Sequence, residues 1–121
     1  MPKKILVVDD DPSTIHLVET ILNTEGYETL SAVDGLDAMV KIKKHHPHLV
    51  VLDIVMPEIN GYDVCYQLRY NKEYESIPIV LLTERQQEIS DDIGRKVNIE
   101  YLHKPLKSKD LIDKVNSFLK K

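Results

Sequence analysis

Several features that would assign the chain to a particular class of protein are scarce or missing. Cys65 is the one cysteine in 121 residues, so no disulfide can form within the chain and a reducing compartment is expected. Acidic residues outnumber basic ones by 20 to 16, and the net charge of −4 argues against nucleic-acid binding. No apolar run approaches the roughly 20 residues that span a bilayer. The start, "MPKKILVVDD", also lacks the apolar core of a signal peptide. We therefore expect a cytoplasmic globular protein without membrane contact.

Short apolar runs alternate with segments of helical periodicity along the whole chain. Strands are expected at residues 4–9, 28–33, 49–53, 77–83 and 99–102. Helices are expected from Pro12, Gly35, Gly61 and Ser108, with a weaker one over 84–97; the expected N-caps are Asp11, Asp34 and Ser108. This alternation predicts an α/β fold with a five-stranded parallel sheet in the order 2-1-3-4-5 and helices on both faces. We expect residues 1–121 to form a single domain.

Polar side chains follow four of the expected strands at their carboxyl ends. Asp9 and Asp10 follow the first strand, Asp53 ends the third, Thr83 ends the fourth, and Lys104 comes after the fifth. Ligands of open α/β sheets bind at this edge. Three carboxylates gathered there repel one another unless a cation joins them, and Mg²⁺ is the oxygen-binding ion expected. A hydroxyl and an ammonium beside it suit a phosphoryl group, which a carboxylate can accept as an aspartyl-phosphate.

The strand-end motifs, taken together, resemble one protein family. The motifs are "ILVVDDDP", "LVVLDIVMPEINGYDV", "IPIVLLT" and "YLHKP", in this order. They are similar to the receiver domain of bacterial two-component response regulators, over residues from about Lys3 to Leu119. The resemblance implies the flavodoxin-like (βα)5 receiver fold and a phosphoryl-accepting signalling switch. It implies no enzyme activity beyond the chain's own phosphorylation and dephosphorylation.

The resemblance also implies roles for the acidic residues. Asp53 corresponds to the phosphoacceptor of the family. Asp10 corresponds to a direct Mg²⁺ ligand, Asp9 to a partner that acts mainly through water, and the backbone carbonyl of Val55 to a further ligand. Mn²⁺ is the expected substitute for Mg²⁺ at such a site.

Other matching positions correspond to the parts of the family that respond to phosphorylation. Thr83 resembles the switch hydroxyl, Tyr101 the aromatic residue that changes rotamer with it, and Lys104 the partner of the phosphoryl group. The bond between Lys104 and Pro105 corresponds to a cis peptide. The expected phosphoryl donor is a sensor histidine kinase or a phosphotransfer protein. The expected output partner, a further domain or a target protein, reads the surface of the helix at 84–97, the strand at 99–102 and the last helix.

Three residues near the site depart from what is usual or favourable. The residue after the switch threonine is usually small in the family, and here it is Glu84. Arg85 follows at the mouth of the site, and Val55 has no hydrogen-bonding group to orient an attacking water. We expect Glu84 to slow phosphorylation by small, freely diffusing donors. We expect Val55 and Arg85 to prolong the phosphorylated state.

Two other functions remain as alternatives. A Mg²⁺-dependent phosphohydrolase with an aspartyl nucleophile would need a substrate pocket and a second acid–base group near Asp53, and 121 residues leave no cap domain to supply them. A flavodoxin-like cofactor carrier is disfavoured, because a phosphate-binding loop after the first strand requires backbone amides and hydroxyls in place of acid. Whether the chain is a stand-alone receiver or a part of a longer regulator stays open.

Three weaker patterns have ordinary structural explanations. The cluster "HHPH" at 45–48 offers three histidines, but zinc would need a fourth ligand, so a solvated loop is expected. Cys65 is expected to fill a small space in the core. Tyrosines recur every fourth residue on the third helix, where Tyr66 and Tyr70 should be partly exposed and could stack; the series is Tyr62, Tyr66 and Tyr70. They mark either a docking surface or a surface cluster over aliphatic stems.

Overall fold

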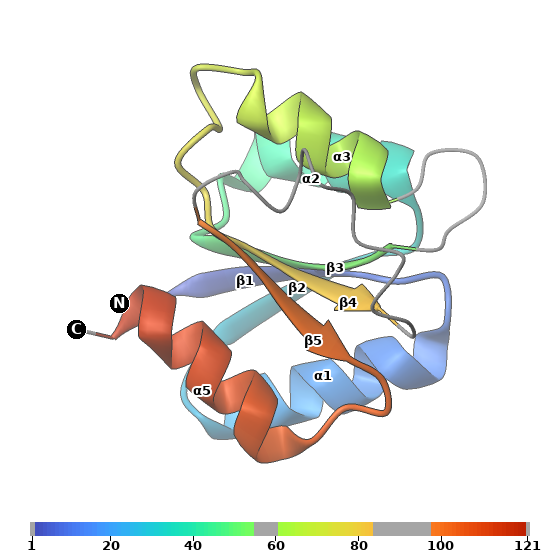
Figure 1. Ribbon diagram of the computed structural model, residues 1–121, viewed down its shortest axis with the longest axis vertical. Coiled ribbons are helices and arrows are strands. Elements are labelled where there is room, and N and C mark those ends of the chain that lie inside the picture. Colours follow the sequence, from blue (N-terminus) through green and yellow to red (C-terminus); the bar gives the residue numbers. More distant parts are fainter. Residues whose placement is uncertain (1, 55–60, 84–97, 121) are drawn as a thin grey trace.

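The chain folds into one parallel sheet between two layers of helices. The computed structural model describes residues 2–54, 61–83 and 98–120. In chain order the elements are β1 (Lys4–Val8), α1 (Pro12–Thr24), β2 (Glu28–Ala32), α2 (Gly35–His45), β3 (Leu49–Asp53), α3 (Gly61–Arg69), β4 (Ile79–Thr83), β5 (Ile99–His103) and α5 (Ser108–Leu119). The strands are parallel in the order β2-β1-β3-β4-β5, which confirms the predicted topology. In Figure 1, α2 and α3 cover one face of the sheet, and α1 and α5 cover the other. The weaker helix expected over 84–97 lies outside the described residues.

The inner strands β3 and β4 are apolar up to their last residue because both of their faces are covered by helices. All five residues of β3 and of β4 are buried. Successive side chains of a strand point to opposite faces. In β3, Val50 and Leu52 therefore join the core beneath α2 and α3, whereas Leu49 and Val51 join the core beneath α1 and α5. Within the described residues, no helix is long and apolar enough to cross a membrane.

Two of the three expected helix caps are confirmed. The Asp11 carboxylate accepts a hydrogen bond from the Ser13 N–H at 2.9 Å, and the Asp34 carboxylate accepts one from the Asp37 N–H at 2.8 Å. Ser108 is not the N-cap of α5. The cap position is Lys107, which makes no side-chain capping bond, and Ser108 is already the first helical residue.

The strand expected from residue 77 begins two residues later. The Ile77 N–H donates to the carbonyl of Tyr74 within a turn, so it is not available to the sheet. Pro78 has no N–H to donate, although its carbonyl accepts from the Val50 N–H at 3.0 Å. Regular pairing between β4 and β5 starts at Ile79 for these reasons.

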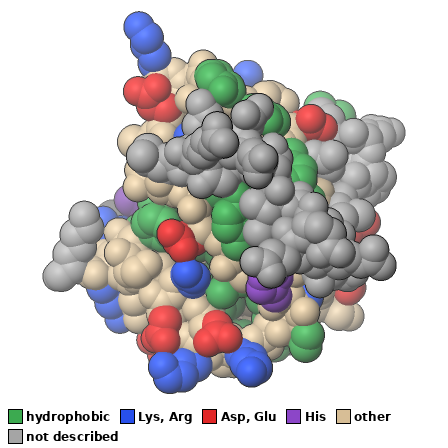
Figure 2. Space-filling model, viewed as in Figure 1, with side chains coloured by type: hydrophobic (Ala, Val, Ile, Leu, Met, Phe, Trp, Pro, Cys, Tyr) green, Lys and Arg blue, Asp and Glu red, His purple; other side chains and the backbone are tan. Residues whose placement is uncertain are grey.

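The helix α5 is joined to the sheet and to the opposite end of the chain by polar contacts. The Lys114 ammonium lies 2.7 Å from the carboxylate of Glu100 on β5. The Tyr27 hydroxyl donates to the side-chain oxygen of Asn116, which joins α5 to the turn before β2. Figure 2 shows acidic and basic side chains next to one another over the part of this face where α5 lies. The α5 face of the described structure is therefore one of paired charges.

A buried arginine connects three segments at the amino-terminal end of the sheet. Arg69, at the end of α3, is only 8% exposed. Its guanidinium donates to the carbonyl of Glu75 at 2.8 Å, to that of Ile77, and to that of Asn98 at 3.3 Å. Burial lowers the pKa of Arg69 from its usual value, but a guanidinium remains protonated in proteins. The charged fork therefore holds the loop before β4 and the residue before β5 against α3.

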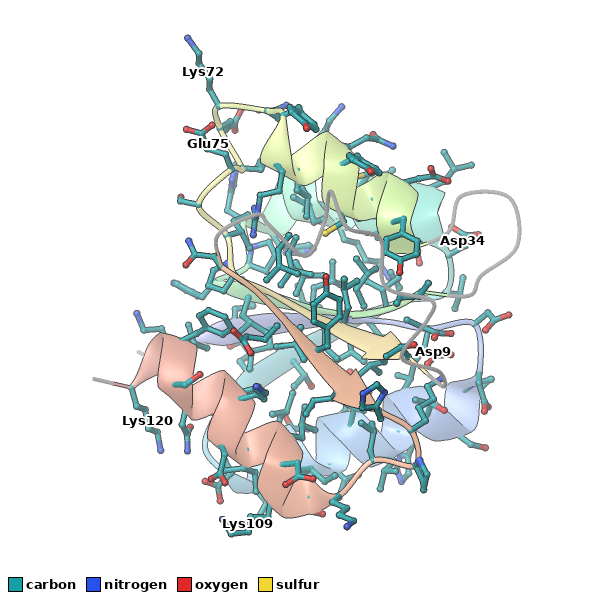
Figure 3. The ribbon with its side chains drawn as sticks, in the orientation of Figure 1. Asp9, Asp34, Lys72, Glu75, Lys109 and Lys120 are labelled. Atoms are coloured by element: carbon teal, nitrogen blue, oxygen red, sulfur yellow. The ribbon has the colours of Figure 1, made fainter. Side chains whose placement is uncertain are left out.

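Replacing Arg69 by alanine should destabilise the fold substantially. Arg69→Ala removes the hydrogen bonds of a buried, charged guanidinium to three backbone carbonyls, so we expect the free energy of unfolding to fall by about 3 kcal/mol. Urea denaturation followed by circular dichroism measures this change. The matched control is Lys72→Ala, because the Lys72 side chain extends away from the molecule (Figure 3) and its loss should change stability by no more than about 0.5 kcal/mol. Equal stabilities of the two variants would contradict the role given to Arg69.

Candidate functional site

The predicted site residues meet at the carboxyl edge of the sheet. Asp9 directly follows β1, and Asp53 and Thr83 are the last residues of β3 and β4. All three are buried, with exposed fractions of 1%, 6% and 1%. Figure 3 shows Asp9 at the end of the sheet toward which the strand arrows point. Because β1, β3 and β4 are neighbours in the sheet, their ends bring these side chains to one place.

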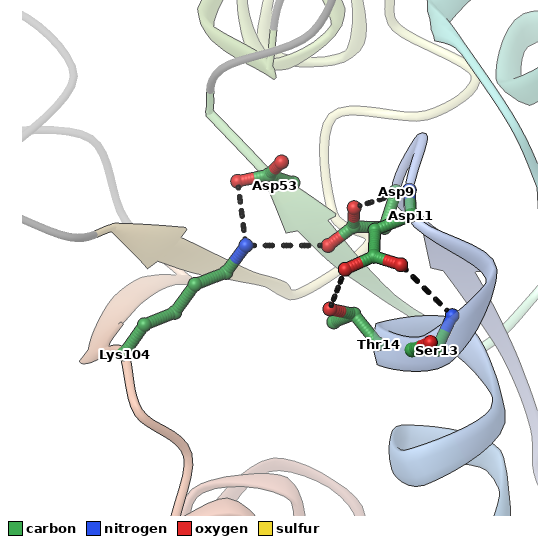
Figure 4. A network of polar contacts seen from close by, with 6 residues as sticks. All are labelled: Asp9, Asp11, Ser13, Thr14, Asp53 and Lys104. Carbon is green, nitrogen blue, oxygen red and sulfur yellow. Dashed lines mark hydrogen bonds and ion pairs between the residues drawn. The ribbon is translucent and has the colours of Figure 1, made fainter.

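Lys104 reaches this group of acids from the loop after β5. Its ammonium lies 3.4 Å from the carboxylate of Asp9 and 3.4 Å from that of Asp53, between the two (Figure 4). The Lys104 N–H donates to the carbonyl of Thr83 at 2.8 Å, which fixes the start of the loop beside the end of β4. The peptide bond between Lys104 and Pro105 is cis, as the sequence resemblance implies.

Three carboxylates lie close enough together to share one cation. Oxygens of Asp9, Asp10 and Asp53 all lie within 4.8 Å of one another, with Asp10 exposed and the other two buried. Both oxygens of Asp9 already have partners, since one accepts from the Asp11 N–H at 2.9 Å and the other faces Lys104. Hard cations such as Mg²⁺ bind to oxygen ligands of this kind. The donor set therefore fits a divalent metal ion.

The site holds more negative charge than its lysine can balance. Burial raises the pKa of Asp9, although the hydrogen bond from Asp11 and the charge of Lys104 oppose the rise. Burial alone would lower the pKa of Lys104, but the carboxylates of Asp53 and Asp9 outweigh it and raise that pKa. Lys104 is thus a firmly protonated cation that serves two buried acids, with Asp10 beside them. A further positive charge would be stabilising here.

Gly61, the expected first residue of a helix, lies directly against the end of β3, and nothing in the sequence alone indicates this contact. The Gly61 N–H donates to the carbonyl of Ile54 at 2.8 Å. A Cβ atom at Gly61 would lie 2.3 Å from the carbonyl oxygen of Asp53 and 2.8 Å from the Cα of Ile54. Because these neighbours are backbone atoms, no residue with a Cβ atom fits at position 61. Gly61 thereby lets α3 begin directly against the strand end that carries Asp53.

Tyr101 has its hydroxyl turned into the protein. The Tyr101 hydroxyl oxygen is buried, and it has no hydrogen-bond partner in the structure as described. Its ring packs against the core beneath α2 and α3. Burial raises the pKa of Tyr101 to about 12, with smaller contributions from Tyr62 and Cys65. An unpartnered buried hydroxyl is costly, and among the described residues it is packing against the core that positions this side chain.

Three predicted residues of the site lie outside the described part of the chain. They are Val55, Glu84 and Arg85. The expected metal contact of the Val55 carbonyl stays a prediction. The same holds for the expected slow loading and long lifetime of the phosphorylated state.

The weaker patterns of the sequence belong to the scaffold. His48 accepts a hydrogen bond from the Lys4 N–H at 2.9 Å, and no cluster of the described residues brings the histidines at 45–48 together as metal ligands.

Cys65 is buried in the core, as expected, and burial raises its pKa to about 12. The rings of Tyr66 and Tyr70 stack with centroids 6.1 Å apart, and Tyr70 is 67% exposed. The predicted stacking and exposure are therefore confirmed.

The comparisons with known proteins agree on one family. Residues 5–116 match the family model of the response regulator receiver domain. The chain is 40% identical over 121 residues to the probable transcriptional regulator ycf27 of Porphyridium aerugineum, covering 98% of this chain and 49% of that protein. It is 35% identical to the alkaline phosphatase synthesis transcriptional regulatory protein PhoP of Bacillus subtilis, covering 100% of this chain and 50% of that protein. The chain thus spans about half the length of these curated relatives.

A solved structure gives the same result. The chemotaxis response regulator CheY4 of Vibrio cholerae superposes with a TM-score of 0.87 at 28% identity, covering 98% of this chain and 99% of that one. The fold is therefore the CheY-like, flavodoxin-like fold that was predicted. With the sequence match over most of its length, the chain belongs to the response regulator receiver domain family of two-component signalling.

Proposed function

We propose that the chain is a phosphoryl-accepting switch in which Asp53 takes a phosphoryl group from a phosphohistidine. The donor is a sensor histidine kinase or a phosphotransfer protein. The observation that carries this proposal is the Lys104 ammonium, 3.4 Å from both Asp9 and Asp53 at the end of the sheet. A carboxylate held beside a fixed cation is suited to accept a phosphoryl group, because charge that develops on the phosphoryl oxygens is stabilised at once.

The transfer exchanges one bond to phosphorus for another. A carboxylate oxygen of Asp53 forms a bond to phosphorus while the bond between phosphorus and the donor's imidazole nitrogen breaks. The electron pair of the broken bond stays on the imidazole, which leaves as histidine. Lys104 holds the Asp53 carboxylate in place before transfer and remains within reach of the phosphoryl oxygens after it.

The metal ion that we propose for this site is Mg²⁺. Asp10 and Asp53 would bind it, with Asp9 in support. When bound, Mg²⁺ would neutralise carboxylate charge and stabilise the negative charge of the phosphoryl group. Asp9 and Asp53 are buried, and this burial restricts where their carboxylates can lie before an ion binds.

We infer that the signal leaves through β5, α5 and the segment at 84–97. Thr83 and Lys104 are joined by a backbone hydrogen bond, so a change at the end of β4 reaches the loop after β5 directly. Tyr101 lies two residues before the end of β5 with an unpartnered hydroxyl. Its inward position competes with an outward one that would hydrate the hydroxyl. New charge at Asp53 would then shift the balance between two packings that already exist.

The surface of β5, α5 and the segment at 84–97 is where we expect an output partner to bind. The output partner would be a further domain of a longer regulator or a separate target protein. The relatives that are named transcriptional regulators support the first of these, because about half of each of them lies beyond the region that this chain matches. We propose no contact of the described domain itself with nucleic acid or membrane.

Mg²⁺ should stabilise the folded chain. The ion binds a carboxylate cluster that exists only after folding, so the melting temperature should rise as Mg²⁺ increases through the millimolar range. Thermal denaturation at constant ionic strength measures the effect, with NaCl as the control for screening. In Asp10→Asn the rise should be much smaller. A melting temperature of the wild type that Mg²⁺ does not move would contradict the metal site.

Asp53 should be the one residue that is phosphorylated by a small acyl phosphate. Intact-mass spectrometry after incubation with acetyl phosphate and Mg²⁺ should show one added phosphoryl group in the wild type. Asp53→Asn should show none, because the amide has lost the nucleophilic oxygen charge. The control Asp63→Asn, at an exposed aspartate of α3, should be labelled like the wild type. Labelled Asp53→Asn would place the acceptor elsewhere, and continuous release of phosphate far beyond one equivalent would favour a phosphohydrolase.

Removing the Tyr101 hydroxyl should not weaken the fold. Tyr101→Phe deletes a buried hydroxyl without a partner, so the free energy of unfolding should stay the same or rise by about 1 kcal/mol. Tyr27→Phe is the matched control, because the Tyr27 hydroxyl donates to Asn116 and its loss should cost about 1 kcal/mol. Urea denaturation of both variants tests the difference. A loss of stability in Tyr101→Phe as large as in Tyr27→Phe would mean that the hydroxyl has a partner after all.

A further inference from the structure

The strand β2 forms one free edge of the sheet. Its backbone groups alternate, as in any strand, between the neighbouring strand and the outside. The Glu28 N–H donates to Lys3 and the Ala32 carbonyl accepts from Asp9, so these residues face β1. The residues between and after them turn their N–H and C=O groups outward, away from the sheet; they are Thr29, Ser31 and Val33. Such groups are a template on which a further strand can pair.

Side chains of α2 occupy two of these outward groups. The Lys41 ammonium donates to the carbonyl of Ser31 at 2.5 Å. The Asp37 carboxylate accepts from the N–H of Val33 at 3.1 Å. The two side chains also contact each other at 3.4 Å, so they form one ion pair that lies on the edge of the sheet.

An ion pair within α2 does not explain why the Lys41 ammonium contacts the carbonyl of Ser31. An acid in the first turn of α2 and a lysine four residues later form an ordinary helical ion pair. That explanation leaves out the bond from Lys41 to a carbonyl of the sheet. Lys43 and Lys44 of the same helix are exposed, whereas Lys41 is partly buried along the strand. The contact of Lys41 with Ser31 therefore needs an explanation at the edge of β2.

Apolar side chains are exposed directly after β2 and on α2, the helix that carries Asp37 and Lys41. Val33 is 54% exposed, Leu36 is 57% exposed and Val40 is 62% exposed. Among the described residues these three belong to the five large hydrophobic side chains that are most exposed, and they follow β2 or lie one turn apart on α2. Val33 directly follows β2, so a strand added at this edge would cover its exposed side chain.

We propose that this edge fits a second copy of the chain, and that Lys41 and Asp37 hold it closed. Two β2 strands can pair antiparallel about a two-fold axis at Ser31. Ser31 then pairs with Ser31 of the second copy, and Thr29 pairs with Val33 in both directions, which is the self-complementary pattern of a two-fold interface. The central carbonyl and one flanking N–H that this pairing requires are the groups that Lys41 and Asp37 occupy. The proposal is independent of phosphoryl transfer.

Loss of the Lys41 ammonium should open the edge. Lys41→Met keeps the aliphatic stem but cannot donate, and Lys44→Met is the matched control with the same change of charge on the same helix. Light scattering after gel filtration, from micromolar to millimolar protein, should give 14.0 kDa for the wild type and for the control. Lys41→Met should self-associate at least tenfold more tightly, toward twice that mass. If it folds poorly by circular dichroism, Lys41→Leu, which also cannot donate, replaces it in the same comparison.

A cross-link identifies the surface that associates. Ser31→Cys added to the Lys41 variant should form an intermolecular disulfide on oxidation, because the two-fold axis brings the two positions together. His16→Cys, at an exposed position of α1, should not do so in the same background. The proposal is overturned if the Lys41 variants stay as monomeric as the control. It is equally overturned if they associate without the cross-link at position 31, or if the wild type already pairs through this edge.

Discussion

One ammonium shared by two buried carboxylates is the interaction around which the site is built. Lys104 follows β5, but its partners Asp9 and Asp53 lie at the ends of β1 and β3, on the far side of β4. The lysine must therefore reach across the end of β4, and its own N–H is fixed there by the carbonyl of Thr83. Among the described residues, Lys104 lies between two buried carboxylates, and the carboxylate of Asp10 lies beside them, so this group carries excess negative charge. Under the proposed function, a bound cation would reduce this excess and so stabilise the fold.

The surrounding scaffold keeps this charged group from relaxing. Gly61 lets α3 start against the peptide of Asp53, so the backbone that carries this carboxylate is held in place by a helix. At the other end of the sheet, Arg69 joins α3 to the entrance of β5 through backbone carbonyls. The strand that carries Tyr101 is thus anchored by Arg69 at its start, and the Lys104 N–H joins the residue after it to the carbonyl of Thr83. Under the proposed function, this second connection is the route by which a change at the end of β4 would reach β5.

Much of this arrangement could be predicted because it depends on local patterns. Continuous apolar runs identified strands covered on both faces, and parallel order then placed Asp9, Asp53 and Lys104 at one edge. The remaining features depend on contacts between segments distant in the sequence. Nothing near Arg69 or Lys41 indicates that their side chains end on backbone carbonyls of other elements. The N-cap expected at Ser108 was wrong because a serine before an apolar face does not fix where the first helical turn begins.

The central claim is that charge added at Asp53 is transmitted to β5. The most direct measurement is a set of amide NMR spectra recorded before and after adding Mg²⁺ with beryllofluoride, which imitates a phosphoryl group on aspartate. The account predicts large shifts for Thr83 and for residues 99–104, with the Tyr101 ring changing its environment, and small shifts for β2 at the far edge of the sheet. Bound beryllofluoride with unchanged signals at 99–104 would contradict it.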